Sequence, residues 1–496
     1  MEYFDVIIVG AGISGVGAAR HLQVMRPGKT YQIIEARAET GGTWDLFRYP
    51  GIRSDSDMFT LGYGFRPWRT PKVIADGPSI KSYVNETARH YGIDRNIRFG
   101  ETVEKIDFDT ARARWTVTAK TAGGEKKYSC NFLWMCSGYY KYAAGYTPEF
   151  PGREDFRGDI IHPQSWPENY DYSGKRVVVI GSGATAVTLI PSMTDKAAHV
   201  TMLQRSPSWF YTLPESSNAA VMLSRFMPRS LAYRLIRWWR IAFQQIMFKL
   251  IRARPKKSGE NLLNLVREQL PDGYDVEKHF QPRYNPWDQR LCVVPDGDLF
   301  RAIREGDASV ETDTIERFVE NGVRLTSGKT LEADLIVTAT GLDLQAMGGA
   351  KASVDGRAVD LGKTFTYRGV MISDLPNAAF VFGYTNSSWT LRADLVSQYV
   401  CRLLKHMDAR GADMATPVND DPDMKAEPFL DLNSGYVLRA AERLPKQGDR
   451  APWRNPQSYF REIAILKYGR IDDGVMRFSK SARAQAAGEA AAVAAE

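Results

Sequence analysis

Two glycine-rich turns in this sequence have residue types and spacing that suit the binding of dinucleotide phosphates. The first has Gly10, Gly12 and Gly15 in a G-x-G-x-x-G pattern. Such glycines permit a tight turn, close approach of a pyrophosphate, and close packing of a helix on a strand. Ser14 lies where that helix begins, and a helix N-terminus offers free N–H groups to phosphates. Glu35 ends the next apolar run, and its carboxylate suits ribose hydroxyls, so we expect a dinucleotide without a 2′-phosphate here.

The second turn, at 181–186, repeats the design with alanine in the place of the third glycine. After the next apolar run come Arg205 and Ser206 rather than an acid. A guanidinium and a hydroxyl favour a 2′-phosphate, which a carboxylate would repel. This turn therefore predicts a site for NADPH, formed by Gly181, Ser182, Gly183, Ala184, Thr185 and Ala186.

The segments around both turns predict the elements that position them. Apolar, branched runs at 4–9 and 175–180 precede the turns, helical patterns follow, and further apolar runs at 31–35 and 199–204 come next. Strand, turn, helix and strand in this order indicate parallel α/β units. The sequence thus predicts an α/β fold with two dinucleotide-binding, Rossmann-like domains. Two dinucleotides in one chain suggest that electrons pass between them.

Composition narrows the class of protein. The 496 residues are enough for two or three domains, and 44% hydrophobic with 25% charged residues is typical of a soluble globular protein. The four cysteines form no C-x-x-C pair, so we expect neither a metal site nor a dithiol centre. The first strand pattern starts within a few residues of the N-terminus, and no uncharged apolar run approaches about 18 residues. These features predict a cytoplasmic protein, and nothing indicates nucleic acid as a partner.

Positive charge is concentrated between residues 216 and 259, which contain ten Lys or Arg and no Asp or Glu. Helical spacing places basic and apolar residues on opposite faces. Two interpretations remain open: weak contact of 225–257 with an anionic membrane surface, or a helical insert packed on its own domain with solvated arginines. The basic face has Arg234, Arg237, Arg240, Lys249 and Arg252, and the apolar face has Leu235, Trp239, Ala242, Phe243, Ile246 and Leu250.

A linker between the turns carries the sequence pattern F-x-G-x-x-x-H-x-x-x-W-P. It resembles the fingerprint of type I Baeyer–Villiger monooxygenases, and tryptophan at the penultimate position favours these over the related flavin-containing monooxygenases. Stretches at 41–57, 284–292 and 383–390 are similar to the ethionamide-activating branch of that family. The fingerprint residues are Phe156, Gly158, His162, Trp166 and Pro167.

The resemblance implies that FAD occupies the first site and NADPH the second. NADPH reduces the flavin, and the reduced flavin traps O2 as a C4a-peroxide that converts an apolar ketone to an ester or lactone. The open alternative is oxygenation of sulfur or nitrogen in thioethers, thioamides or amines. Two weaker alternatives are a flavin-bearing membrane adaptor and a futile NADPH oxidase.

The resemblance also implies a domain plan. The fold resembles that of flavin monooxygenases and disulfide reductases, with a helical insert in the second domain. We expect an FAD domain at 1–140 and 350–496, an NADP domain at 141–349, the insert at 214–284, and a disordered tail at 484–496.

Residue roles follow from the matched stretches. Arg290 corresponds to the family's active-site arginine, which keeps the peroxide anionic, and Asp55 to the carboxylate beside it. Arg53 is expected to reach the nicotinamide dinucleotide. His162 is expected to support a hinge rather than act as a base. The flavin is expected to contact Thr43, Trp44, Asp45, Leu46 and, at its adenine, Val103.

One departure concerns the 2′-phosphate. Many relatives carry lysine beside the active-site arginine, whereas this chain has Gln289. We expect Arg205 and Ser206 to make the protein prefer NADPH over NADH. The difference in affinity between the two should be smaller than in the relatives that carry this lysine. The missing charge-assisted contact corresponds to about 1.5–3 kcal/mol.

Overall fold

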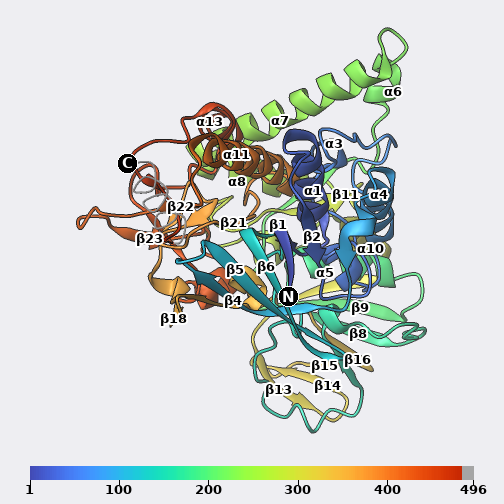
Figure 1. The fold of residues 1–496 in the computed structure, drawn as a ribbon. Coiled ribbons are helices and arrows are strands. Elements are labelled where there is room, and N and C mark those ends of the chain that lie inside the picture. Colours follow the sequence, from blue (N-terminus) through green and yellow to red (C-terminus); the bar gives the residue numbers. More distant parts are fainter. Residues whose placement is uncertain (483–496) are drawn as a thin grey trace, which may run out of the picture.

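A computed structural model describes residues 1–482 of the chain, so the tail predicted at 484–496 lies outside the described residues. Two α/β units make up the body of the molecule (Figure 1). A helical segment extends along one side.

The first unit is built on β1 (Glu2–Val9), whose run Val6–Val9 is almost fully buried. β1 pairs in parallel with β2 (Tyr31–Ile34) and β6 (Gly124–Met135). The β1 strand leads through the first glycine turn into α1 (Ile13–Met25). Other strands of this sheet are β3 (Ile97–Arg98), β4 (Thr102–Asp109), β5 (Arg114–Thr121), β17 (Lys351–Val354), β18 (Arg357–Ala358), β19 (Thr366–Tyr367), β20 (Met371–Ile372) and β21 (Ala378–Phe380).

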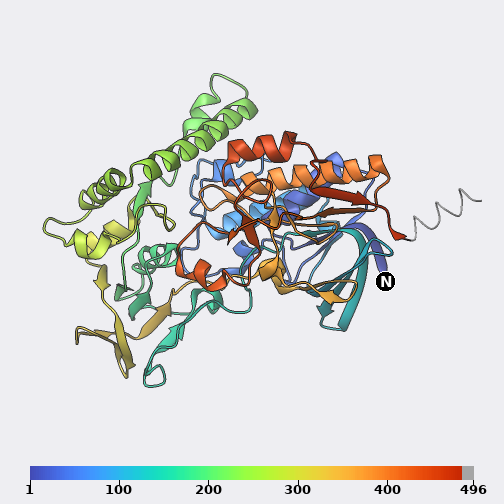
Figure 2. The same ribbon diagram turned by 90° about the vertical axis from the view of Figure 1, so that its left-hand side faces the viewer.

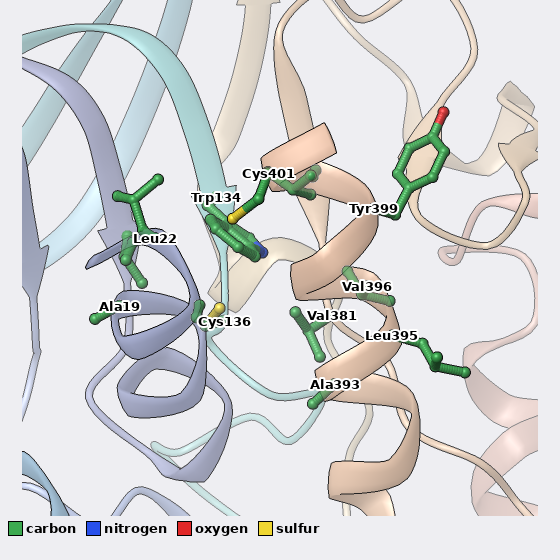
Figure 3. Packing of buried hydrophobic residues seen from close by; sticks show 14 of the residues in the cluster. Ala19, Leu22, Trp134, Cys136, Val381, Ala393, Leu395, Val396, Tyr399 and Cys401 are labelled. Atoms are coloured by element: carbon green, nitrogen blue, oxygen red, sulfur yellow. The ribbon is translucent and has the colours of Figure 1, made fainter. Parts of the chain in front are cut away.

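The C-terminal part of the chain completes the core of the first unit. The long helix α11 (Trp389–Arg410) packs beside α1, and Figure 3 shows Leu22 of α1 facing Trp134 and Cys401. Strand β17 pairs in parallel with β4. Segments separated by more than 200 residues of sequence therefore share one hydrophobic core.

The second unit is a parallel sheet in the order β12-β9-β8-β16-β7. Strand β8 enters the second glycine turn, which α5 follows. α10 also packs on this unit. Its elements are β7 (Asp159–Ile161), β8 (Arg176–Ile180), α5 (Ala184–Met193), β9 (His199–Gln204), α10 (Asp298–Glu305), β12 (Ala308–Thr312) and β16 (Leu335–Thr338).

Strands β10 (Phe210–Leu213) and β11 (Cys292–Pro295) pair in parallel and bracket the helical segment. It contains α6 (Ala219–Leu223), α7 (Arg229–Ala253), α8 (Pro255–Arg267) and α9 (Val276–Phe280). Both views place α7 along the outer edge of the molecule, with α6 at its far end (Figures 1 and 2).

The contacts of α7 correct the predicted basic face. Arg237 and Arg240 are not solvated: their side chains are 14% and 18% exposed and bond to the first unit. Arg237 donates to the carbonyls of Phe59, Thr60 and Gly62, and Arg240 donates to Asp57 at 2.7 Å.

Smaller elements complete the fold. They are α2 (Thr43–Leu46), α3 (Met58–Leu61), α4 (Gly77–His90), α12 (Gly435–Ala440), α13 (Tyr459–Glu462), the antiparallel strands β13 (Ile315–Val319), β14 (Gly322–Leu325) and β15 (Thr330–Glu332), and the pairs β22 (Met414–Pro417) with β25 (Met476–Ser479) and β23 (Ala426–Pro428) with β24 (Lys446–Gly448).

The predicted fold class is confirmed, with two Rossmann-like units and a helical insert in the second. The numerical limits of the domains stay predictions. Within residues 1–482, no helix combines the length and the apolar character needed to cross a membrane.

Candidate active site

A cavity of about 690 Å³ is lined by residues of both units, including both glycine-rich turns. The turns meet the same cavity because each follows the carboxyl end of a central parallel strand, where ligands of open α/β sheets bind. Gly10 and Gly12 line it from the first unit, and Gly181 and Gly183 from the second.

The first turn requires its glycines for steric reasons. Gly10 has φ +103°, and a Cβ there would lie 2.7 Å from the carbonyl oxygen of Cys136. A Cβ on Gly15 would lie 1.8 Å from the carbonyl oxygen of Gly10, so Gly15 allows α1 to pack on the turn without itself lining the cavity. The Ser14 hydroxyl accepts a hydrogen bond from Trp389 Nε1 at 2.7 Å. These features fit a turn that holds a pyrophosphate at the start of α1.

Glu35 is 4% exposed and lines the cavity. Its carboxylate accepts hydrogen bonds from the backbone N–H groups of Ala11, at 2.6 Å, and Arg37, at 2.9 Å. Burial raises the pKa of this carboxyl, and those two bonds oppose the rise. The carboxylate is held next to the first turn, in a position that suits a ribose.

The four residues of α2, all predicted to contact flavin, differ in whether they line the cavity. Thr43 and Trp44 line the cavity, whereas Asp45 and Leu46 do not, and the contact of all four with flavin stays a prediction. Asp45 binds Arg37 and Lys81; burial works to raise its carboxyl pKa, but the hydrogen bonds from these cations lower it on balance. The Leu46 side chain packs in the core of the second unit. Successive residues of a helix point in different directions, so one short turn cannot present all four side chains to one ligand.

Val103 is 7% exposed and lines the cavity near Glu101 and Thr102. Arg53 also lines the cavity, but its guanidinium forms an ion pair with Asp298 of the second unit. The arginine that we expected at the nicotinamide dinucleotide thus bridges the two units, and Asp298 is the partner that sequence reasoning missed.

The second turn has one glycine in a crowded position and one in an open position. Gly181 has φ +136°, and a Cβ there would lie 2.4 Å from the carbonyl oxygen of Ala339, whereas a Cβ on Gly183 would meet nothing within 4 Å. Ser182, Ala184 and Thr185 line the cavity at the start of α5. Ala186 is fully buried and does not line it.

Arg205 is exposed and lines the cavity beside this turn. Among residues 1–482 no carboxylate forms an ion pair with it, so its charge is available to an anionic ligand. Ser206 does not line the cavity, and its carbonyl oxygen accepts a bond from the Ser182 hydroxyl at 3.2 Å. The neighbouring Ser208 lines the cavity instead and is 2.9 Å from Ser182 Oγ.

Arg290 and Asp55 lie together in the cavity wall although 235 residues separate them in sequence. The Arg290 Nη1 atom is 3.4 Å from Asp55 Oδ2, and Arg290 Nε is 3.4 Å from the carbonyl oxygen of Thr385. The Asp55 carboxylate raises the pKa of the guanidinium above its already high value, against the opposing effect of burial. Arg290 is therefore a permanent cation that faces the space between the two turns.

Aromatic residues that sequence reasoning missed form another part of the wall. Tyr139 stacks on Trp389 with ring centroids 5.1 Å apart, and its hydroxyl is 2.6 Å from that of Tyr140. Burial raises the pKa of Tyr139 to about 12, so the phenol keeps its proton at neutral pH. Trp389 belongs to the matched stretch 383–390, but its contact with the first turn depends on the placement of α11.

The fingerprint residues hold the linker against the second unit rather than facing the cavity. Phe156 packs at 6.4 Å on Phe318, and a Cβ on Gly158 would lie 2.5 Å from the carbonyl oxygen of Asp334. Trp166 packs against Tyr170. Pro167, which follows, is exposed.

His162 uses both ring nitrogens within the protein. Nδ1 accepts from the backbone N–H of Gln164 and Nε2 donates to the carbonyl of Gly341, each at 3.1 Å. Burial lowers the pKa of the ring, so it is neutral at pH 7. A ring with both nitrogens engaged is not free to act as a general base, and the hinge role remains our prediction.

Comparison with known proteins identifies the family. Residues 70–347 match the model of the family described as flavin-binding monooxygenase-like, and residues 8–87 match an NAD(P)-binding Rossmann-like domain. The chain belongs to the flavin-binding monooxygenase-like family. This monooxygenase is 54% identical to the FAD-containing monooxygenase EthA of Mycobacterium tuberculosis over 97% of this chain and 98% of EthA.

Two further relatives frame the comparison. The probable FAD-binding monooxygenase AlmA of Acinetobacter baylyi is 48% identical to this monooxygenase, over 97% of each chain. A solved steroid monooxygenase, in oxidised form bound to NADP, shares its fold with a TM-score of 0.76 and 23% identity, over 96% of this chain and 100% of that one.

Proposed function

We propose that this monooxygenase is an FAD- and NADPH-dependent Baeyer–Villiger enzyme that converts apolar ketones to esters or lactones. The overall reaction takes a ketone, O2, NADPH and a proton, and yields an ester, water and NADP⁺. The observation that carries the proposal is the Arg290–Asp55 pair in the wall of the cavity that both glycine-rich turns line.

The residues present fit both cofactors. Gly10, Gly12 and Glu35 offer a pyrophosphate turn and a ribose carboxylate for FAD, and the second turn with Arg205 suits NADPH. When bound, these cofactors supply hydride transfer and O2 activation, and thus the oxygen atom that the substrate receives.

The chain's own residues control charge and water. Arg290 remains protonated at any working pH and holds a negatively charged oxygen beside the substrate carbonyl. Asp55 orients the guanidinium and offsets part of its charge. The wall formed by Tyr139, Tyr140 and Trp389 limits water on one side. A permanent cation at Arg290 would favour the anionic, nucleophilic form of the oxygen that the cofactors supply, which is the form suited to a carbonyl carbon.

The nicotinamide site favours NADPH on electrostatic grounds. Arg205 is an exposed cation at the second turn, and a guanidinium can bind a 2′-phosphate through two hydrogen bonds. Gln289 also lines the cavity and supplies no charge, so the preference over NADH rests on Arg205.

We expect a small or medium apolar ketone as the substrate, because several tyrosines and Trp389 line the cavity together with Arg290. A sulfur-containing substrate is the competing candidate. It requires an electrophilic, protonated oxygen donor, which Arg290 disfavours. We also propose weak contact of 225–257 with an anionic membrane surface, since apolar substrates partition into membranes.

Product analysis tests this function. The purified flavoprotein is supplied with NADPH and air, and separately with a linear ketone and a thioether of matched size. We expect ester from the ketone with one oxygen atom derived from ¹⁸O2. Sulfoxide without ester, or hydrogen peroxide in place of any oxygenated product, would refute the proposal.

A further inference from the structure

The outward side of the helical segment exposes a run of large apolar side chains. We call this set the outer stripe. Phe226 is 85% exposed and Trp239 is 58% exposed, and Trp239 stacks on Phe243 at 5.5 Å rather than on the body of the protein. Large apolar side chains exposed together on one short segment are typical of an interaction site. The stripe consists of Met222, Phe226, Leu231, Leu235, Trp239, Phe243, Ile246, Met247 and Leu250.

The inner side of α7 is fixed to the protein by polar and apolar contacts. Arg237 and Arg240 bond to α3 and its flanking residues, as described above. Further along the helix, Ile241 packs with Tyr384 and Leu391, and Gln245 donates to the Ser387 hydroxyl at 2.7 Å. Because these contacts hold the helix in one orientation, the outer stripe cannot turn inward to bury itself.

Exposed cations occur along the same segment as the stripe. Eight of the ten basic residues between 216 and 259 are exposed, and no acidic residue occurs in that range. One of them, Arg252, lies 3.7 Å from an exposed Asp431, a weak surface pair. The exposed cations are Arg225, Arg229, Arg234, Lys249, Arg252, Arg254, Lys256 and Lys257.

We infer that the outer stripe inserts into the interface of an anionic lipid bilayer, with the exposed cations of that segment at the headgroups. Long Lys and Arg side chains reach headgroups while aromatic residues occupy the boundary with the acyl chains. A second copy of the chain is a poorer occupant, since pairing two such faces would bring two sets of cations together without acids to neutralise them. This geometry disfavours the second interpretation of the sequence, in which the insert packs on its own domain and its arginines are solvated.

The inner contacts of α7 connect this surface to the candidate active site. Tyr384 and Ser387, which Ile241 and Gln245 contact, also line the cavity. Phe248 packs at 5.1 Å on Trp287, three residues before Arg290. Resting on the proposed function, the inference adds that the enzyme draws apolar substrates from the bilayer across the side of the cavity that α7 covers.

Vesicle binding by the full-length flavoprotein tests the surface. Vesicles of phosphatidylcholine alone are compared with vesicles containing phosphatidylglycerol, at low and high salt. The stripe variant carries Trp239→Glu and Phe243→Glu. Its matched control carries Val24→Glu and Phe99→Glu, which alter two hydrophobic residues, 59% and 40% exposed, elsewhere. We expect binding to the anionic vesicles that weakens with salt, and on the order of a hundredfold weaker binding for the stripe variant only.

Activity separates this inference from the proposed function. We expect the stripe variant to oxidise a short, water-soluble ketone at the wild-type rate and a long-chain ketone in vesicles several-fold more slowly. If neither the wild-type protein nor the control variant binds anionic vesicles, or if the stripe and control variants bind them equally, the membrane inference is wrong whatever the activity. Loss of self-association in the stripe variant, without vesicle binding, would assign the stripe to a second copy. If no ketone is oxidised in either setting while vesicle binding holds, the function fails and the surface stands.

Discussion

Arg290→Met offers the sharpest test of the proposed chemistry. Methionine is unbranched, fills part of the space of the arginine side chain and has no charge, so the main change is the loss of the cation. At the 3.4 Å that separates Arg290 from Asp55, two unit charges attract by about 5 kcal/mol at an effective dielectric constant of about 20. The Arg290 side chain is 38% exposed, so this value is an upper bound, and loss of one group that stabilises an anionic oxygen typically costs about 3 kcal/mol.

That energy corresponds to a roughly hundredfold slower oxygenation step, within the range of about a hundred- to a thousandfold that follows loss of one stabilising group at an oxyanion. Folding should change little, because an ion pair exposed to this degree contributes only about 1 kcal/mol. We therefore expect a protein that still binds flavin, with a markedly slower rate of ester formation.

The assay separates the two half-reactions. Flavin reduction by NADPH is followed by absorbance without oxygen, and ester formation is followed by product analysis in air. The matched control is Arg439→Met, which removes a guanidinium that also lines the cavity but stacks on Tyr146 at 3.5 Å instead of meeting Asp55. Undiminished ester formation by Arg290→Met, or equal losses in both variants, would refute the assigned role of Arg290.

Three further predictions concern the cofactor turns and the linker. Arg205→Ala should raise the KM for NADPH about ten- to a hundredfold and leave the KM for NADH unchanged, because it removes a charge-assisted contact with the 2′-phosphate; steady-state NAD(P)H oxidation measures both, and equal effects on the two would contradict the site. Gly15→Ala should yield protein without bound flavin, because its Cβ would overlap the carbonyl of Gly10, whereas Gly28→Ala, with nothing within 4 Å, should keep its flavin absorbance. Burial lowers the pKa of His162 in the folded state, so protons bind preferentially to the unfolded chain and the stability of the protein falls as the pH drops below about 6.5, the usual histidine pKa. The Tm of His162→Asn should be lower than that of the wild type but should depend less steeply on pH between about 7 and 5. An unchanged slope of Tm against pH would contradict this.

The outcome at the glycine-rich turns illustrates what local sequence can predict. Gly10, Gly15 and Gly181 have positions that only glycine can fill, and the reason is steric and local to a strand, a turn and a helix. The order of strand, turn, helix and strand also predicts that Arg205 lies near the second turn, because it directly follows the second strand of that unit. These features could be predicted from the sequence because each depends on residues that are near one another in the chain.

Other parts of the site required the fold. Trp389 reaches Ser14, and Arg53 reaches Asp298, only because distant segments pack together. The pairing of Asp45 with Arg37 and Lys81 was not predicted either, since the direction of a side chain in a short helix depends on how that helix packs. Family resemblance supplied Arg290 and Asp55, and spacing in the sequence alone could not have paired them.

The helical segment shows most clearly the difference between what the sequence determines and what the tertiary structure determines. Sequence determined that the chain forms two dinucleotide-binding units and that a basic, amphipathic helix interrupts the second. Helical periodicity defines two faces, but it carries no information about which face meets the protein. Tertiary packing decided that Arg237 and Arg240 point inward and that the outer stripe faces solvent. The physical reason is that the carbonyl groups of residues 59, 60 and 62 and the Asp57 carboxylate compensate these cations for burial. Those partners lie more than 170 residues earlier in the chain.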